Sequence, residues 1–396
     1  MSKILFLCSF SLEAARKKGM PTEGIAAERD YTGYFEHVHT VHFPVEPEMS
    51  VMIGPRHTVH EFSKGRFGPF AGVKLVNNFL SVAVFLFKVR RLLIRERIDI
   101  IRAIDPGEQG AYAYILSKLT GVPWCVSVHA DRDLYHDMAG TFLLFGSRKI
   151  SRAVEKFVLR RAPLVLAISR YIADWVISMG ADPDRVRIIY HGIDVSGDEG
   201  PGADPGVGFK VPEGKKVVSF VGRLSREKYV HDVVLIAEEL SKKRKDAVFL
   251  IVGEGPEKED LKNMISARGL AGTVILLGAR PNAEVNRIRK ISDVNFCPLS
   301  GFSLLEAALS GKPVVAYDVE WHKELIENGK TGMLVPKGDT AAAVAAMDKL
   351  LSDPALGAEL GKNARDTVKN RHSLEKVSRA KLDCYRELLG INSRRL

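Results

Sequence analysis

The chain alternates short, continuous runs of apolar residues with longer segments in which apolar residues recur every three or four positions. Continuous apolar runs are typical of strands buried on both faces of a parallel sheet, and the longer period is that of helices packed on such a sheet. The first half therefore predicts strands at 4–8, 38–43, 98–103, 123–128, 164–168 and 187–190, and helices at 73–97, 109–119, 148–161 and 170–179. This alternation indicates an α/β fold.

Residues 195–214 interrupt the pattern with many glycines and prolines and no apolar periodicity, as expected of a hinge. The pattern then starts again. It predicts strands at 217–221, 247–252, 274–277, 294–297, 313–316 and 332–335. It also predicts helices at 230–242, 256–268, 282–291, 303–310, 322–327 and 340–351, and a last amphipathic helix at 374–389. We expect an N-terminal Rossmann-like domain at 1–194, the hinge at 195–214, a C-terminal Rossmann-like domain at 215–373, and a terminal helix at 374–396 that packs back on the first domain. Two such sheets would place a ligand cleft at the carboxyl ends of their strands.

Charge and cysteine content narrow the function classes. The chain has 58 basic and 48 acidic residues, and the first 192 residues alone have 26 and 19, so most of the positive excess lies in the first half. This imbalance favours an anionic partner for that half. The four cysteines are far apart and form no C-x-x-C, so they suggest neither a zinc site nor a disulfide framework, and a reducing, cytoplasmic location fits. The most apolar later stretch, 79–87, is too short to span a membrane.

A turn rich in cations follows the strand predicted at 217–221. It carries Arg223, Arg226 and Lys228 directly before the next helix. Cations at a helix N-terminus oppose the helix dipole, so a purely structural role is disfavoured unless an anion binds there. Arg223 and Lys228 would form charge-assisted hydrogen bonds to a diphosphate. A solvated basic turn remains the alternative.

A second turn joins the strand that ends near Pro298 to a helix that begins near Ser303. Its free backbone N–H groups suit phosphate or sugar oxygens. Glu306 lies one turn into this helix, where its carboxylate could accept two hydrogen bonds from a vicinal diol such as a ribose. Alternatively, Glu306 only places favourable negative charge near the helix N-terminus.

The order of these motifs resembles glycosyltransferase family 4. The resemblance rests on G-R-L-S-R-E-K from Gly222, V-G-E-G-P at 252–256, G-F-S-L-L-E-A from Gly301 and G-K-P-V-V from Gly311, and in the first half on S-V-H-A-D at 127–131, L-A-I-S-R-Y at 166–171 and Y-H-G-I-D at 190–194. Members of this family are retaining enzymes of the GT-B fold that use nucleotide sugars. The resemblance therefore implies two Rossmann-like parallel-sheet domains facing a central cleft.

The resemblance also implies roles for the matching residues. Arg223 and Lys228 would hold the donor diphosphate and stabilise it as it leaves, Glu306 would bind the ribose, and His129 would lie at the donor sugar. The implied catalytic residues are His129, Arg223 and Lys228, and the implied donor-binding residues are Gly222, Arg223, Lys228, Ser300, Gly301, Phe302, Ser303, Leu304, Leu305 and Glu306. A histidine that only ends a strand is the alternative for His129.

Three positions depart from the family pattern. The first glutamate of the family's E-x(7)-E motif is Pro298 here, and Ser300 stands nearest to its place. The residue that contacts the transferred hexose is therefore left open. Tyr229 follows Lys228 where the family often has glycine, and His191 replaces the asparagine of the N-G-V-D turn.

Neither a metal nor a redox cofactor is expected. Asp131-Arg-Asp133 is a D-x-D tripeptide, but it follows the histidine turn and not the context that D-x-D has in the other main glycosyltransferase fold. Gly253-Glu-Gly255 lacks the third glycine of a dinucleotide-binding motif. We expect the nucleotide sugar to act as a co-substrate without an essential metal.

The basic amphipathic segment 85–97 allows two interpretations. It either covers the first sheet with its basic face in water, or it lies on an anionic membrane surface. No nucleic-acid partner is expected, because no basic stripe interleaved with aromatic residues is present.

We therefore expect a retaining glycosyltransferase of hexosyltransferase type, which acts on a glycan or lipid-linked glycan acceptor in cell-surface polysaccharide or glycolipid assembly. Its expected location is the cytoplasm, with peripheral association at the inner face of the membrane left open. Two alternatives also stay open: a nucleotide-sugar epimerase of the GT-B fold, and a binding-only relative that has lost transfer.

Overall fold

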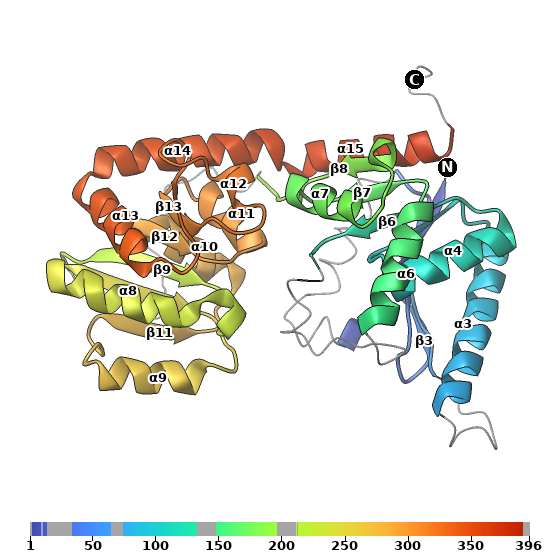
Figure 1. Cartoon of the computed structure of the whole chain (residues 1–396), viewed down its shortest axis with the longest axis horizontal. Coiled ribbons are helices and arrows are strands. Elements are labelled where there is room, and N and C mark those ends of the chain that lie inside the picture. Colours follow the sequence, from blue (N-terminus) through green and yellow to red (C-terminus); the bar gives the residue numbers. More distant parts are fainter. Residues whose placement is uncertain are drawn as a thin grey trace. The chain divides into compact units, whose positions relative to one another are not determined.

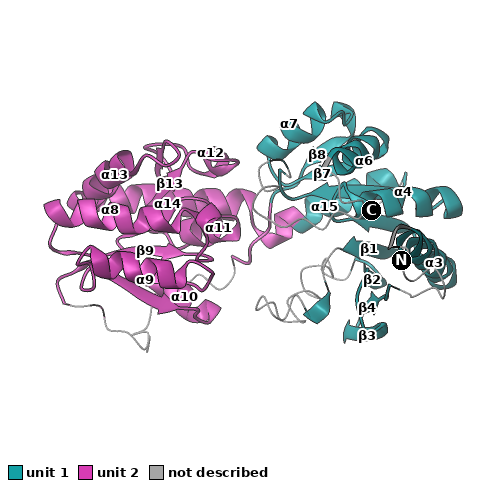
Figure 2. Ribbon diagram, turned by 60° about the horizontal axis from the view of Figure 1, so that its bottom comes forward, with its two compact units in different colours: residues 1–190, 378–396 teal, residues 191–377 magenta. Residues whose placement is uncertain are grey.

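A computed structural model describes residues 2–8, 11–13, 34–64, 74–131, 133, 148–195, 211 and 213–390. The chain forms two compact units (Figure 2): unit 1 comprises residues 1–190 and 378–396, and unit 2 comprises residues 191–377. Most of the hinge predicted at 195–214 lies outside the described residues, so the predicted domain boundaries stay a prediction.

Unit 1 is built on an eight-stranded sheet with the order β3-β4-β2-β1-β5-β6-β7-β8. The strands are β1 (Lys3–Cys8), β2 (His37–His42), β3 (Met49–Gly54), β4 (His57–Glu61), β5 (Ile100–Ala103), β6 (Trp124–Val128), β7 (Val165–Ala167) and β8 (Val186–Ile188). Its helices are α3 (Lys74–Glu96), α4 (Glu108–Thr120), α6 (Arg148–Arg161), α7 (Arg170–Ser178) and the short 3₁₀ turn η3 (Pro183–Arg185). All strand pairs are parallel except β3 with β4, which is antiparallel.

One face of this sheet carries the largest apolar core of unit 1. Fully buried residues of the central strands, such as Leu5, Ile101 and Val126, pack in one cluster with Val89 and Leu93 of α3. Helix α4 contacts both α3 and α6, so the three helices form one layer (Figure 1).

The last helix, α15 (Leu374–Leu388), begins in unit 2, and its residues from Ser378 on belong to unit 1. Tyr385 is fully buried, accepts a hydrogen bond from Nη1 of Arg102 at 2.5 Å, and packs edge-on against Phe35 with ring centroids 5.6 Å apart. The end of the chain's last helix therefore contributes to the core of unit 1.

Unit 2 is built on a six-stranded, fully parallel sheet with the order β11-β10-β9-β12-β13-β14. The strands are β9 (Lys216–Val221), β10 (Ala247–Val252), β11 (Val274–Gly278), β12 (Val294–Cys297), β13 (Val314–Tyr317) and β14 (Met333–Val335). The helices are η4 (Arg226–Lys228), α8 (Val230–Lys243), α9 (Lys258–Ala267), α10 (Asn282–Ile291), α11 (Phe302–Leu309), α12 (His322–Leu325), α13 (Thr340–Ser352) and α14 (Pro354–Arg371). Helices α8 and α13 pack on one face of the sheet and α10 on the other, so both faces are covered.

The α/β class is confirmed, and the strands predicted from apolar runs all occur, with ends shifted by one or two residues. The sequence analysis missed the edge pair β3 and β4, because three of the five residues of β4 are histidine or glutamate and the strand has no apolar run. It also missed α14, whose buried side consists largely of small residues such as Gly357, Gly361 and Ala364. A Cβ atom on Gly361 would overlap the carbonyl oxygen of Gly311, so this helix approaches the α11–β13 turn as closely as only glycine allows. Among the described helices, none is both long and apolar enough to cross a bilayer.

Candidate active site

Two loops of unit 2 hold the predicted diphosphate-binding turn in place. After β9, the N–H groups of Gly222 and Leu224 donate to the carbonyl oxygens of Val252 and Glu254, each at 3.0 Å, so this loop follows the loop after β10. Gly253 has a φ of +142°, and a Cβ atom there would overlap the carbonyl oxygen of Gly222. The V-G-E-G-P sequence therefore allows the loop after β10 to contact the loop after β9 closely. This contact fixes the position of the turn that carries the cations.

The three cations of that turn differ in their partners. Arg226 is exposed and pairs with Glu257 at 3.2 Å, whereas neither Arg223 nor Lys228 forms an ion pair with the described residues. Burial lowers the pKa of Lys228, and Glu320 and Glu227 partly oppose this shift. A partly desolvated ammonium without a close carboxylate gains most from an incoming anion.

Tyr229 follows Lys228 in a left-handed conformation, with a φ of +52°. This geometry explains why glycine suits the position, since it adopts positive φ values without the steric cost that a side chain brings. The Tyr229 ring meets the Tyr317 ring edge-on at 5.6 Å, and these contacts hold the residue in the conformation that begins α8.

A buried histidine contacts the second predicted turn, residues 298–301. His322 is fully buried; its Nδ1 lies 3.0 Å from the carbonyl oxygen of Tyr317, and its Nε2 lies 3.1 Å from the backbone nitrogen of Ser300. Burial lowers the pKa of His322 to about 4, so the ring is neutral at pH 7. Nε2 also lies 3.0 Å from the carbonyl oxygen of Ser300, so the ring contacts both backbone groups of Ser300 and the carbonyl oxygen of Tyr317.

Helix α11 begins one residue before the predicted start, at Phe302, and Gly301 provides no side-chain cap for its N-terminus. The N–H of Leu304 donates to the carbonyl oxygen of Gly301 at 3.1 Å, and the side chains of Leu304 and Leu305 are fully buried. The N–H groups of Phe302 and Ser303, which have no acceptor one helical turn earlier, are thus the ones available to phosphate or sugar oxygens.

Glu306 forms an ion pair that the sequence analysis did not predict. Its Oε2 lies 2.7 Å from Nη2 of Arg289, whose side chain is only 3% exposed. Arg289 also donates to Oγ of Ser303 at 3.0 Å and to Oδ1 of Asn286 at 3.1 Å, and Ser303 in turn donates to the carbonyl oxygen of Val221 at 2.9 Å. A buried guanidinium therefore fixes one carboxylate oxygen of Glu306 and ties it to the end of β9. The other oxygen, Oε1, receives no hydrogen bond from the described residues.

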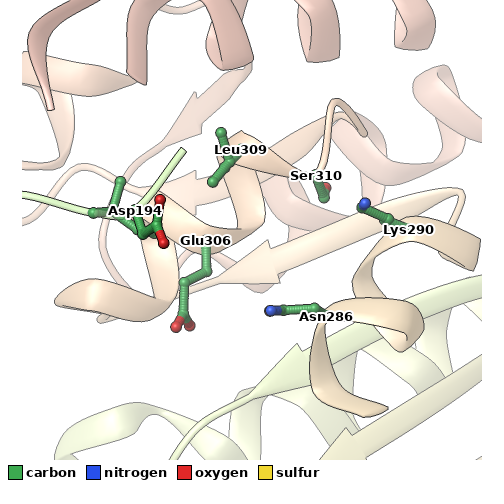
Figure 3. Close-up of a pocket in the computed structure, with 7 residues that line it drawn as sticks. Asp194, Asn286, Lys290, Glu306, Leu309 and Ser310 are labelled. Atoms are coloured by element: carbon green, nitrogen blue, oxygen red, sulfur yellow. The ribbon is translucent and has the colours of Figure 1, made fainter. Parts of the chain in front are cut away.

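A pocket of about 360 Å³ adjoins Glu306 within unit 2 (Figure 3). It is lined by Ile193, Asp194, Asn286, Lys290, Glu306, Leu309 and Ser310. The side chains of Glu306 and Asn286 project toward the same space from α11 and α10, respectively (Figure 3). At the start of α11, Phe302 is 40% exposed and lies against the ring of His191, with centroids 4.4 Å apart.

The sequence analysis missed Arg289, His322, Asn286 and Lys290. One signal for Arg289 was present: it follows Val285 and Ile288 at helical spacing, and that stripe of α10 is the buried one. A basic residue on a buried stripe indicates a buried partner. No comparable signal identified His322, because its partners are backbone groups of a turn 22 residues away.

His129 belongs to unit 1, where it is exposed directly after β6. Next to it, Asp131 accepts a hydrogen bond from the Tyr171 hydroxyl at 2.8 Å, and Asp133 accepts one from Nε1 of Trp175 at 3.1 Å and pairs with Arg152. Both carboxylates of the D-x-D tripeptide thus have side-chain partners in unit 1. In unit 2, the ligand atoms of His231, Glu257 and Asp260 lie within 4.8 Å of one another, so the expectation of no essential metal stays a prediction.

Comparisons with known proteins identify the family. Residues 33–196 match the model of Glycosyltransferase Family 4, and residues 208–367 match that of Glycosyl transferases group 1. The chain is 30% identical over 288 residues to the 2-deoxystreptamine N-acetyl-D-glucosaminyltransferase of Streptomyces fradiae, covering 70% of this chain and 67% of the relative. It is 28% identical over 316 residues to the alpha-D-kanosaminyltransferase of Streptomyces kanamyceticus, covering 77% of this chain and 81% of the relative.

Solved structures show the same fold. Sucrose-phosphate synthase from Thermosynechococcus elongatus superimposes with a TM-score of 0.77 at 19% identity, covering 99% of this chain and 100% of that structure. Anabaena HepE in complex with UDP superimposes with a TM-score of 0.74 at 18% identity, covering 98% and 100%. These neighbours have the GT-B fold, and the named relatives are transferases, which supports transfer and not the epimerase alternative. The chain is a glycosyltransferase, and it belongs to glycosyltransferase family 4.

Proposed function

We propose that the enzyme transfers a hexosyl group from a nucleotide-diphosphate sugar to a glycan or lipid-linked glycan, with retention of configuration at the anomeric carbon. The observation that carries this proposal is the difference among the cations of unit 2: Arg223 and Lys228 have no carboxylate partner among the described residues, whereas Arg226 has one. Two unpaired cations that precede a helix suit the two phosphate groups of such a donor.

Glu306 supports the nucleoside part of the proposed donor. Arg289 holds one carboxylate oxygen at 2.7 Å, and the carboxylate is about one-third exposed at the edge of the pocket. A carboxylate fixed in this way can accept hydrogen bonds from the two hydroxyls of a ribose without losing further side-chain entropy. The pocket beside it has room for part of a nucleoside.

The proposed chemistry needs the diphosphate to leave first. Negative charge then develops on the leaving oxygen, and Arg223, Lys228 and the N-terminus of α11 would stabilise it. His129 of unit 1 would stabilise the positive charge at the anomeric carbon through its carbonyl oxygen or its ring. No metal is required in this scheme, because the two side-chain cations take the role that a divalent ion has in other transferases.

The relatives support a hexosyl donor, since their names describe transfer of kanosaminyl and N-acetyl-D-glucosaminyl groups. We propose that the acceptor is a glycan or lipid-linked glycan of cell-surface polysaccharide or glycolipid assembly. A cytoplasmic location, with association at the inner face of the membrane, goes with this proposal. The four cysteines are all free and buried, which suits a reducing compartment.

The test is thermal denaturation of the full chain against a panel of nucleotide sugars and free nucleotides. A ligand of the native state raises the midpoint with the logarithm of its concentration over its dissociation constant. We expect a shift with one nucleotide series, reduced in Arg223→Ala and Glu306→Ala and unchanged in Lys243→Ala, an exposed cation at the end of α8. If no donor shifts the midpoint, the proposed donor site is wrong.

A binding-only relative is the second candidate, and the side chain of Pro298 motivates it. Proline stands where the family places the first glutamate of its motif, and it offers no hydrogen-bonding group to a hexose. Release of free nucleotide that depends on an added acceptor would establish transfer. A thermal shift without such release would favour binding alone.

A further inference from the structure

Helix α3 in unit 1 has an apolar outer face. Its inner side packs on the sheet through Phe85, Val89 and Leu93, which are at most 2% exposed. On the outer side, Phe79 is 73% exposed and Ile94 is 55% exposed. A helix that covers a sheet normally carries polar and charged residues on its outer face. Within the segment 85–97, therefore, some apolar side chains cover the sheet, whereas Phe87 and Ile94 are exposed.

The exposed apolar residues recur along one side of the helix, where Arg90 and Arg91 lie between Phe87 and Ile94. Phe87 is 57% exposed and lies eight positions after Phe79 and seven before Ile94, spacings that return to the same side of a helix. Val76 and Val84 extend the strip, at 36% and 38% exposure. At 1.5 Å per residue the strip from Phe79 to Ile94 is about 22 Å long. We call these five residues the α3 strip.

Basic residues accompany this strip on the same helix. Helix α3 contains five basic residues and one acidic residue, and α6, the third helix of the same layer, contains six and one. The guanidinium of Arg91 lies 5.9 Å from the centroid of the Phe87 ring, and Arg90 and Arg97 flank the strip near Ile94. None of these three arginines forms an ion pair with the described residues, whereas the acid of α3, Glu96, pairs with Arg95 at 2.8 Å.

We propose that the α3 strip and the neighbouring arginines dock the enzyme on an anionic lipid bilayer. This inference rests on the proposed function, in which a lipid-linked glycan acceptor lies at a membrane. Apolar side chains enter the boundary between headgroups and acyl chains, and the arginines bind the phosphates above them. The axis of α3 then lies parallel to the membrane plane.

Two other occupants fit these observations less well. A nucleic acid would pair with the arginines but would leave large apolar side chains such as Phe79 and Phe87 without a partner. A second copy of the chain would bury the strip, but it would bring a second basic helix toward Arg90, Arg91 and Arg97 without supplying the anions that they lack. An anionic bilayer satisfies the apolar and the basic residues together.

The test is cosedimentation of the full chain with vesicles of phosphatidylcholine alone and of phosphatidylcholine with about 30% phosphatidylglycerol. We expect binding only to the anionic vesicles, and weaker binding as sodium chloride rises from about 0.1 to 0.5 M. In Arg90→Gln/Arg91→Gln the partition coefficient should fall about 25-fold, at about fivefold for each arginine near the surface. Lys242→Gln/Lys243→Gln, which removes two exposed lysines from α8 of unit 2, is the control of equal charge and should bind as the parent does.

A second pair of variants tests the apolar contribution. Phe79→Ser/Phe87→Ser should lower the partition coefficient more than tenfold even in high salt, because it removes apolar area that the bilayer would bury. Met52→Ser, 61% exposed on β3, is the control and should leave binding unchanged. Both altered side chains of the test variant are mostly exposed, so its melting temperature should match that of the parent.

Several outcomes would overturn the proposal. One is equal binding of the parent chain to neutral and anionic vesicles, and another is unchanged binding in both test variants. A third is a parent chain that elutes as a dimer in size-exclusion chromatography, with a monomer only in the Phe79→Ser/Phe87→Ser variant. The donor-dependent thermal shift and transfer to a soluble acceptor are measured on the same preparations. If the parent chain shows the thermal shift and transfer but does not bind anionic vesicles, the membrane surface alone is refuted. If the parent binds anionic vesicles but shows neither the shift nor transfer, the proposed donor site alone is refuted.

Discussion

Arg289→Met should weaken both the folded state and the donor site, because one buried guanidinium serves three partners. Arg289 forms an ion pair with Glu306 at 2.7 Å and donates hydrogen bonds to Ser303 at 3.0 Å and to Asn286 at 3.1 Å, and its side chain is 3% exposed. Methionine preserves most of the apolar contact but none of these hydrogen bonds. Each bond to a charged group contributes about 1.5–3 kcal/mol, but Glu306 is about one-third exposed and regains water.

We therefore expect the free energy of unfolding to fall by about 2–4 kcal/mol in Arg289→Met. Urea denaturation followed by tryptophan fluorescence measures this loss, since Trp321 is 7% exposed and precedes α12 in the same unit. The matched control is Arg268→Met, which removes an exposed pair with Glu238 at 2.6 Å and should cost less than about 1 kcal/mol.

A double-mutant cycle with Glu306→Gln isolates the ion pair. If Arg289 and Glu306 interact as described, the double variant should be less destabilised than the sum of the single variants, with a coupling of about 1–2 kcal/mol. Coupling below about 0.5 kcal/mol would refute the ion pair, since independent sites add within that margin. The same variants should lose most of the donor-dependent thermal shift. An undiminished donor-dependent thermal shift in both single variants would show that the Arg289–Glu306 pair does not organise the donor site.

Four further predictions concern other parts of the molecule. Arg223→Ala should lower turnover by about 100-fold or more with little change in melting temperature, because Arg223 is exposed; turnover within threefold of the parent would exclude it from the diphosphate site. Gly253→Ala should destabilise the chain by about 2 kcal/mol or more, since its Cβ would overlap the carbonyl oxygen of Gly222, whereas Gly272→Ala, with open space around it, should be nearly neutral; equal effects would contradict the packing. Burial lowers the pKa of His39 to about 3 and that of His60 to about 4, so both rings are neutral in the folded state and protonate more readily when unfolded. Their contribution to stability is complete above the unfolded pKa of about 6.5 and is lost as the pH falls toward 4, so urea midpoints that rise between pH 7 and 4.5 would contradict this burial. Transfer should persist in EDTA, and a loss that added divalent metal restores would replace the metal-free scheme.

The candidate site was predictable to the extent that its motifs are local. The cations Arg223 and Lys228 and the turn before Glu306 follow strands that the sequence marks as buried, so their placement near one sheet edge could be predicted. The difference between Arg226 and Arg223 could not, because it depends on Glu257, which lies on the loop of the next strand. The same holds for Glu306, whose partner lies 17 residues earlier on another helix.

By itself, the sequence determined which segments become strands and helices, the order of the family motifs, and hence the α/β class. Apolar runs and helical periodicity record how each segment meets a core, and that record is local. The tertiary structure alone decided that Arg289 holds Glu306, that His322 supports the turn at Ser300, and that the outer side of α3 stays exposed. Each of these features depends on contacts between residues that lie far apart in the sequence. A pattern of hydrophobicity gives the inward and outward faces of a segment, but burial also depends on the elements that cover it, and only the folded chain fixes those.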